Sequence, residues 1–112
     1  MTAGAGPTVI CTYRVRRGRE REFEALLACH WPALREAGLV TAELSQVYRG
    51  ADETGKTVFV EIFTWRDAAA VEEAHRRAEV TALWRPMGAL CEERLGRPAM
   101  EFPHVQRVTP RP

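Results

Sequence analysis

The sequence predicts an α+β protein of the ferredoxin-like kind, with the element order βαββαβ and an antiparallel sheet. Four segments alternate in character at every second residue, which is typical of strands. Two longer segments repeat apolar residues every three or four positions, which is typical of helices. A hairpin between the second and third strands then leaves both helices on one face of the sheet.

The first strand is expected over residues 8–15, where the letters "TVICTYRV" alternate between two faces. A helix is expected over residues 19–37, because its apolar side chains form one stripe. Gly38 followed by an apolar residue is a usual helix stop. Pro32 lies inside this helix without an N–H to donate, so we expect a kink or break near residues 28–31.

The hairpin is expected to consist of strands over residues 41–49 and 57–65, joined by a turn-rich loop over residues 50–56. Asp67 can cap the helix that follows the third strand. The apolar stripe of that helix resets its phase around residues 78–79. One kinked helix and two shorter helices are both compatible with this pattern.

The last strand is expected over residues 99–108, and Pro103 within it indicates a sheet edge or a bulge. The sequence therefore predicts a single domain over residues 8–108. A flexible N-terminal arm over residues 1–7 precedes it, because that segment is small and glycine-rich. A loose tail over residues 109–112 follows it.

Composition narrows the classes of function. The chain has 112 residues, with 16 basic and 15 acidic side chains, so its formal charge of +1 gives no electrostatic case for nucleic acid or an anionic membrane. No run of about 18 apolar residues is present, and the first residues lack the features of a signal peptide. Three cysteines without a C-x-x-C motif indicate reduced thiols. These features predict a cytoplasmic protein.

The third strand is apolar on both of its faces, although the helices can cover only one face of the sheet. An exposed apolar patch of several hundred square ångströms would be unusual for a soluble monomer. We therefore expect a symmetric homodimer that buries the open sheet face of each copy against the other. The alternative is a monomer whose own arm or tail covers that face.

A carboxylate and a histidine stand out on these apolar surfaces. Glu61 lies between Phe59 and Phe63 on one strand face, and a buried carboxylate must be paired or protonated. His75 lies on the apolar stripe of its helix and is expected to face the sheet. In the functional interpretation His75 is a general base or a substrate hydrogen-bond partner, and Glu61 orients it. In the structural interpretation His75 bonds to a backbone carbonyl or to Glu61, and Glu61 pairs with an arginine or across a dimer interface.

Several aromatic side chains either line a pocket for a planar ligand or simply fill the core. The candidate pocket residues share strand or helical spacing and are Trp65, Phe63, Tyr13, Trp31 and Trp84. His30 is a second candidate base and pocket residue, and His104 on the last strand is a weaker one. The three histidines lack the spacing of metal ligands, so no metal site is expected.

The segment "FVEIFTWRDAAAVEEAH", residues 59–75, resembles the antibiotic biosynthesis monooxygenase-like family of the dimeric α/β-barrel superfamily. That family has an acidic-x-aromatic-x-Trp run on the third strand, a polar cap, an alanine-rich first helical turn and a histidine further along the helix. The similarity covers roughly residues 8–108. The residues that match this pattern are Glu61, Phe63, Trp65, Asp67, Ala69, Ala70 and His75.

This resemblance implies a homodimer with a pocket between sheet and helices in each subunit. Some members oxidise quinols or anthrone-type aromatic compounds with O₂ and no bound cofactor, and others degrade haem. Haem-degrading members use an Asn on the first strand and a Trp and a His on the second helix. Here the first strand has no Asn, His75 stands at the Trp position, and the His position falls near Arg85. No haem and no other cofactor is therefore expected.

Two hypotheses of different classes follow. The first is a cofactor-free monooxygenase for a small aromatic or quinol-type substrate, with His75 as base, Glu61 as its orienter, and Trp65 and Phe63 in the pocket wall. The second is a noncatalytic dimer that binds a small apolar ligand or acts as an accessory protein. The fold alone does not decide between these hypotheses, because one fold can host many chemistries. An enclosed pocket with Glu61 and His75 at its wall would favour the first.

Overall fold

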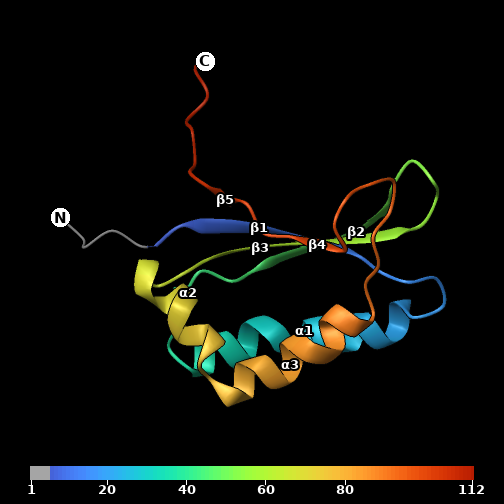
Figure 1. Ribbon diagram of the computed structural model, residues 1–112. Coiled ribbons are helices and arrows are strands. Elements are labelled where there is room, and N and C mark those ends of the chain that lie inside the picture. The colour runs from blue at the N-terminus through green and yellow to red at the C-terminus, as the bar shows by residue number, and fades with distance from the viewer. Residues whose placement is uncertain (1–5) are drawn as a thin grey trace.

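The computed structural model describes residues 6–112, so most of the predicted N-terminal arm, residues 1–5, lies outside the described residues. The α+β prediction is confirmed, with three helices below an antiparallel sheet (Figure 1). The elements follow one another as β1 (Thr8–Arg14), α1 (Glu20–Glu36), β2 (Gln46–Ala51), β3 (Thr57–Thr64), α2 (Ala68–His75), α3 (Ala78–Ala89), β4 (Met100–Glu101) and β5 (His104–Val105).

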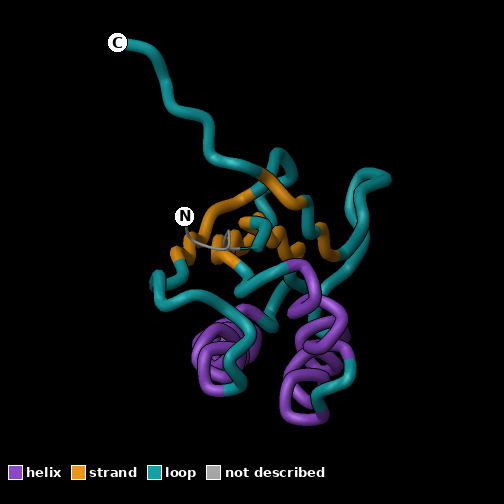
Figure 2. The backbone as a smooth tube through the Cα atoms, turned by 90° about the vertical axis from the view of Figure 1, so that its left-hand side faces the viewer, coloured by secondary structure: helices purple, strands orange, loops and turns teal. Residues whose placement is uncertain are grey.

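The strand order is β2-β3-β1-β4, and β5 also pairs with β1. Seen along the sheet in Figure 2, α1 lies to one side below the strands, and α2 and α3 lie to the other. The central pair, β1 and β3, is antiparallel, with Val9 opposite Phe63 and Cys11 opposite Glu61. This register places alternate residues of both strands on the helix-covered face.

The hairpin is shifted from its predicted position. The predicted strand over residues 41–49 begins too early, because residues 41–45 form no strand and β2 begins at Gln46. Strand β2 instead runs through Ala51, within the predicted loop. Asp52 closes a shorter turn by accepting hydrogen bonds from the backbone N–H and the hydroxyl of Thr54 at 2.9 and 2.5 Å.

Helix α1 ends where the sequence predicts. Gly38 adopts a left-handed conformation with φ 73°, which glycine adopts at little cost because it has no Cβ. Leu39 donates its N–H back to the Leu34 carbonyl at 3.0 Å. The predicted break near residues 28–31 is absent, since the helix is continuous from Glu20 to Glu36 with Pro32 inside it. His30 therefore stays on the buried side of an unbroken helix.

The helical region after β3 consists of two helices. Asp67 caps α2 as predicted, accepting a hydrogen bond from the Ala70 N–H at 2.9 Å. The phase reset in the apolar pattern corresponds to the break between His75, where α2 ends, and Ala78, where α3 begins. This break lets α3 change direction and pack against α1.

The predicted last strand over residues 99–108 is split into β4 and β5, both paired with β1. Pro103 lies between the two and lacks the N–H that a continuous ladder would use. Its carbonyl still accepts a hydrogen bond from the Ile10 N–H at 3.0 Å. The split therefore keeps this segment at the sheet edge, as the proline indicated.

A buried arginine fastens the segment between α3 and β4. The Arg94 guanidinium donates to the Asp52 carboxylate at 2.8 Å, to the Thr57 carbonyl at 3.1 Å and to the Val15 carbonyl. Hydrogen bonds from Thr54 and from Arg94 hold the pKa of Asp52 well below its usual range. These contacts hold the returning chain against the hairpin loop and the end of β1.

The two faces of the sheet differ in burial. The helix side carries a buried core that includes Val9, Phe59 and Phe63. The opposite side carries Val60 and Ile62, which are half-buried, and Tyr48, which is 57% exposed. Within residues 6–112, no helix has both the length and the apolar character needed to cross a bilayer.

Candidate functional site

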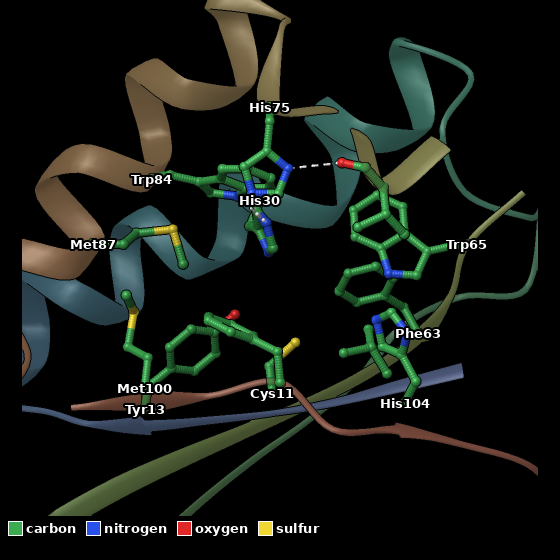
Figure 3. A pocket seen from close by; sticks show the side chains of 13 residues that line it. Cys11, Tyr13, His30, Phe63, Trp65, His75, Trp84, Met87, Met100 and His104 are labelled. Atoms are coloured by element: carbon green, nitrogen blue, oxygen red, sulfur yellow. Dashed lines mark hydrogen bonds between the residues drawn. The ribbon is translucent and has the colours of Figure 1, made fainter. Parts of the chain in front are cut away.

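A cavity of about 310 Å³ lies between the sheet and the helices (Figure 3). Its volume is at the lower end of the range for small-molecule pockets. Its walls are mainly apolar, sulfur-containing and aromatic, with three imidazoles among them. The lining residues are Val9, Cys11, Tyr13, His30, Phe63, Trp65, Val71, His75, Trp84, Met87, Met100, Phe102 and His104.

Glu61 lies directly behind the cavity wall, with 0% of its surface exposed. The Tyr13 hydroxyl donates to its Oε1 at 2.8 Å. His30 Nδ1 lies 2.8 Å from Oε1 and 3.1 Å from Oε2 of the same carboxyl group. Because an ionised carboxylate only accepts hydrogen bonds, these two side chains supply the donors that its burial requires.

His30 is fixed on both ring nitrogens. Its Nε2 lies 2.9 Å from the indole Nε1 of Trp84, and an indole nitrogen can only donate. Nε2 therefore carries a lone pair, and the proton of the neutral ring is on Nδ1, where it is donated to Glu61. The result is a continuous chain of hydrogen bonds from β1 through β3 and α1 to α3.

Two further groups of this wall, Tyr13 and Cys11, are held in their neutral forms. Burial, reinforced by the Glu61 carboxylate, raises the pKa of Tyr13 well above its ordinary value. Burial and the same carboxylate raise the pKa of the Cys11 thiol far above its ordinary value. Tyr13 therefore remains a hydrogen-bond donor, and Cys11 is a packing residue rather than a thiolate nucleophile.

His75, which the sequence predicted to face the sheet, instead lies at the exposed rim of the cavity, because the buried side of α2 is formed by Ala70 and Ala74. Its Nδ1 lies 2.8 Å from the Val71 carbonyl, which can only accept, so the proton of the neutral ring is on Nδ1. Nε2 then keeps its lone pair and has no hydrogen-bond partner among residues 6–112. Its ring meets that of Trp84 edge to face, with centroids 4.8 Å apart (Figure 3).

The predicted pairing of Glu61 with His75 is wrong. Glu61 bonds to His30 and Tyr13, and His75 bonds to the backbone of its own helix. The alternative pairing of Glu61 with an arginine is also wrong, because its partners are a phenol and an imidazole. The reason is geometric: α1 brings His30 of its buried side within hydrogen-bond distance of Glu61, whereas His75 is the exposed last residue of the short α2.

Most of the predicted pocket residues do line the cavity, with Trp31 as the exception. Trp31 packs partly buried against the core elsewhere, and its indole N–H has no partner among the described residues. Sequence reasoning did not assign Met87 and Met100 to the wall, although both lie on apolar faces of their elements. Their alternation and helical spacing were the available signals.

Trp65 carries an unusual feature of this wall. It is 5% exposed and its indole N–H is buried without a hydrogen-bond partner in the part of the chain that the structure describes. A buried donor without an acceptor costs about 1–3 kcal/mol. That nitrogen has almost no accessible surface, so a ligand in the cavity does not reach it in this conformation.

A metal-binding arrangement is not found within residues 6–112, where no group of three His, Cys, Asp or Glu side chains is placed to hold an ion. His30 and His75 are each engaged in other hydrogen bonds, and His104 lies on the exposed strand β5.

Comparison with known proteins places these features in a family. A family model described as antibiotic biosynthesis monooxygenase matches residues 8–85. No curated protein matches the sequence.

Solved structures match over almost the whole chain. SnoaB, a cofactor-independent oxygenase from Streptomyces nogalater, is 15% identical with a TM-score of 0.66, over 96% of this chain and 100% of that one. Rv0793 from Mycobacterium tuberculosis is 17% identical with a TM-score of 0.65, over 92% and 95%. A conserved protein from Methanosarcina mazei is 10% identical with a TM-score of 0.61, over 93% and 94%. At these identities the likeness establishes the fold.

Tyr13→Phe tests the hydrogen bonding of Glu61. The variant removes one of two donors from a buried carboxylate, so the free energy of unfolding should fall by about 1.5–3 kcal/mol. Urea denaturation measures this change. Tyr48→Phe is the matched control, because it removes the same group and the Tyr48 hydroxyl makes no hydrogen bond within residues 6–112. The loss of that hydroxyl should cost less than about 0.5 kcal/mol. Equal costs for the two variants would contradict the assigned role of Tyr13.

Proposed function

The chain belongs to the antibiotic biosynthesis monooxygenase family, and on that premise we propose that it is a cofactor-free monooxygenase for a small aromatic or quinol-type substrate. The reaction takes place in the cavity between sheet and helices. His75 is the proposed base, and Trp65 and Phe63 form part of the wall that holds the ring.

The observation that carries this proposal is the lone pair of His75 Nε2 at the rim of an apolar cavity. The Val71 carbonyl fixes the ring in the tautomer that a base needs, which is the role first assigned to Glu61. Of the two imidazoles whose hydrogen bonds are defined, His75 alone offers a nitrogen that no side chain occupies. It can therefore take a hydroxyl proton from a bound substrate without prior rearrangement.

The chemistry requires no added reductant. A hydroquinone and O₂ together have the composition of a hydroxyquinone and water, so the substrate supplies all the electrons that reduce O₂. Removal of a hydroxyl proton gives an anion, which donates an electron to O₂ far more readily than the neutral ring does. The protein then has to supply a base, a position for the ring and a site from which water is largely excluded.

The cavity meets the last two needs. Its wall is predominantly apolar, and Phe63 and Trp65 pack against one another at 5.2 Å between centroids.

A homodimer is part of this proposal. The open face of the sheet presents half-buried apolar side chains such as Val60 and Ile62, which the helices on the opposite face do not cover. Burial of such a face between two copies is favourable by about 25 cal/mol for each square ångström of apolar surface. The family resemblance points to the same arrangement.

The noncatalytic alternative has two observations in its favour. His75 bonds to a backbone carbonyl, as the structural interpretation predicted. The hydrogen bonds of Glu61, Tyr13 and His30 are satisfied within the protein, as in a polar network that serves stability alone. In that case the cavity binds a small apolar ligand without converting it.

Oxygen consumption with a panel of hydroquinones and anthrones tests catalysis. The wild-type chain should consume O₂, and His75→Gln should reduce the rate by about 10²-fold or more, because glutamine cannot accept the proton. Glu72→Gln, an exposed change on the same helix, should leave the rate unchanged.

Two outcomes would count against the proposal in different ways. If the wild-type chain consumes no O₂ with any member of the panel, the noncatalytic alternative replaces the enzyme. If turnover occurs but His75→Gln matches the wild-type rate, the base has been misassigned.

Sedimentation velocity tests the dimer separately. The wild-type chain should sediment as a dimer, and Val60→Glu should sediment as a monomer, because it places a charge in the buried interface. Ala82→Glu, on the exposed side of α3, should remain dimeric. A wild-type chain that sediments as a monomer at micromolar concentration would exclude the proposed interface.

A further inference from the structure

Trp84 lies between His30 and His75, two of the three imidazoles in the cavity wall. Its indole N–H donates to His30 Nε2 at 2.9 Å, and its ring packs against that of His75 (Figure 3). The proposed base does not need this hydrogen bond, since the Val71 carbonyl orients His75. The bond instead occupies the only ring nitrogen of His30 that Glu61 does not hold.

The two partners of this hydrogen bond differ in how firmly they are held. His30 is 3% exposed and Glu61 is 0% exposed, and two further hydrogen bonds fix them in the core. Trp84 is only half-buried on α3, and its N–H makes no other hydrogen bond within residues 6–112. If the two partners separate, Trp84 is the one that can move and find water for its N–H.

A ligand hydroxyl can replace the indole N–H as the hydrogen-bond donor to His30 Nε2 without leaving that nitrogen unpaired. His30 Nε2 can only accept in this tautomer, so it takes an O–H donor as readily as an N–H donor. Glu61 on the far side of the ring favours any positive charge that Nε2 gains from sharing the proton of a phenol. A methyl group in place of the hydroxyl cannot donate a hydrogen bond to Nε2, so the hydrogen bond from the indole to His30 is kept.

We propose that Trp84 is a displaceable cap on His30, and that the hydroxyl group of an aromatic ligand takes the place of the indole N–H. His30 is then a specificity-determining residue that favours hydroxylated rings over apolar rings of the same shape. This inference deepens the proposed function, on which it rests only in taking the cavity as the ligand site.

The test compares the binding of 2-naphthol and 2-methylnaphthalene, measured by calorimetry without O₂ so that turnover does not interfere. Trp84→Phe keeps a ring beside His75 but removes the competing donor. It should bind 2-naphthol about three- to ten-fold more tightly than the wild-type chain, because the ligand no longer has to break the hydrogen bond from Trp84 to His30. That factor corresponds to the free energy of one hydrogen bond between neutral groups. Its affinity for 2-methylnaphthalene should change by less than about two-fold, since that ligand does not compete for Nε2.

Trp31→Phe is the matched control, because the Trp31 indole makes no hydrogen bond within residues 6–112 and lies outside the cavity wall. It should leave both affinities unchanged. A second measurement does not depend on any variant: in the wild-type chain, 2-naphthol should move the indole N–H resonance of Trp84 away from its hydrogen-bonded position, and 2-methylnaphthalene should not.

Three results would overturn the proposal: neither ligand binds, Trp84→Phe weakens both ligands alike, or the indole resonance is unmoved by 2-naphthol. These results are separable from a failure of the proposed function. A chain that consumes O₂ but shows no naphthol-specific effect of Trp84→Phe loses this inference alone. A chain that shows the effect but consumes no O₂ loses the enzymatic proposal alone.

Discussion

The structure of this site depends on the hydrogen bonding of one buried carboxylate. Glu61 has no exposed surface, and an unpaired charge at such a position would cost several kcal/mol or more. Tyr13 and His30 supply the necessary donors from β1 and α1. Trp84 extends the same chain to α3. One carboxylate therefore joins four elements that are far apart in the sequence and fixes how α1 lies across the sheet.

The same hydrogen bonds divide the cavity into a fixed part and an adaptable part. His30 is held in one tautomer deep in the wall, and burial keeps the Tyr13 phenol protonated by raising its pKa. His75 lies at the exposed rim and is held only by the backbone of α2. Rigid groups deep in a site give specificity, because they cannot rearrange to accept an unsuitable ligand. A substrate can reach the proposed base, His75, at the rim without any rearrangement of the buried core.

The sequence predicted the elements more successfully than the contacts between them. Local chemistry determines where α1 ends at Gly38 and where Asp67 caps α2, so both were predictable. The partner of Glu61 was not, because His30 and His75 both lie on helices that face the same sheet, and spacing alone does not rank them. The anchoring of the returning chain by Arg94 likewise depends on groups brought together only by the fold.

The most direct test of this account is the protonation pattern of His30, measured by ¹⁵N-resolved NMR of the histidine rings. The account predicts a neutral ring with its proton on Nδ1, and an unprotonated Nε2 that accepts a hydrogen bond from the Trp84 indole. A proton on Nε2 would contradict it, because the Trp84 indole would then have no acceptor on His30. The averaged signals of a freely exchanging imidazole would also contradict it, because Nδ1 would then not be held as a donor to Glu61.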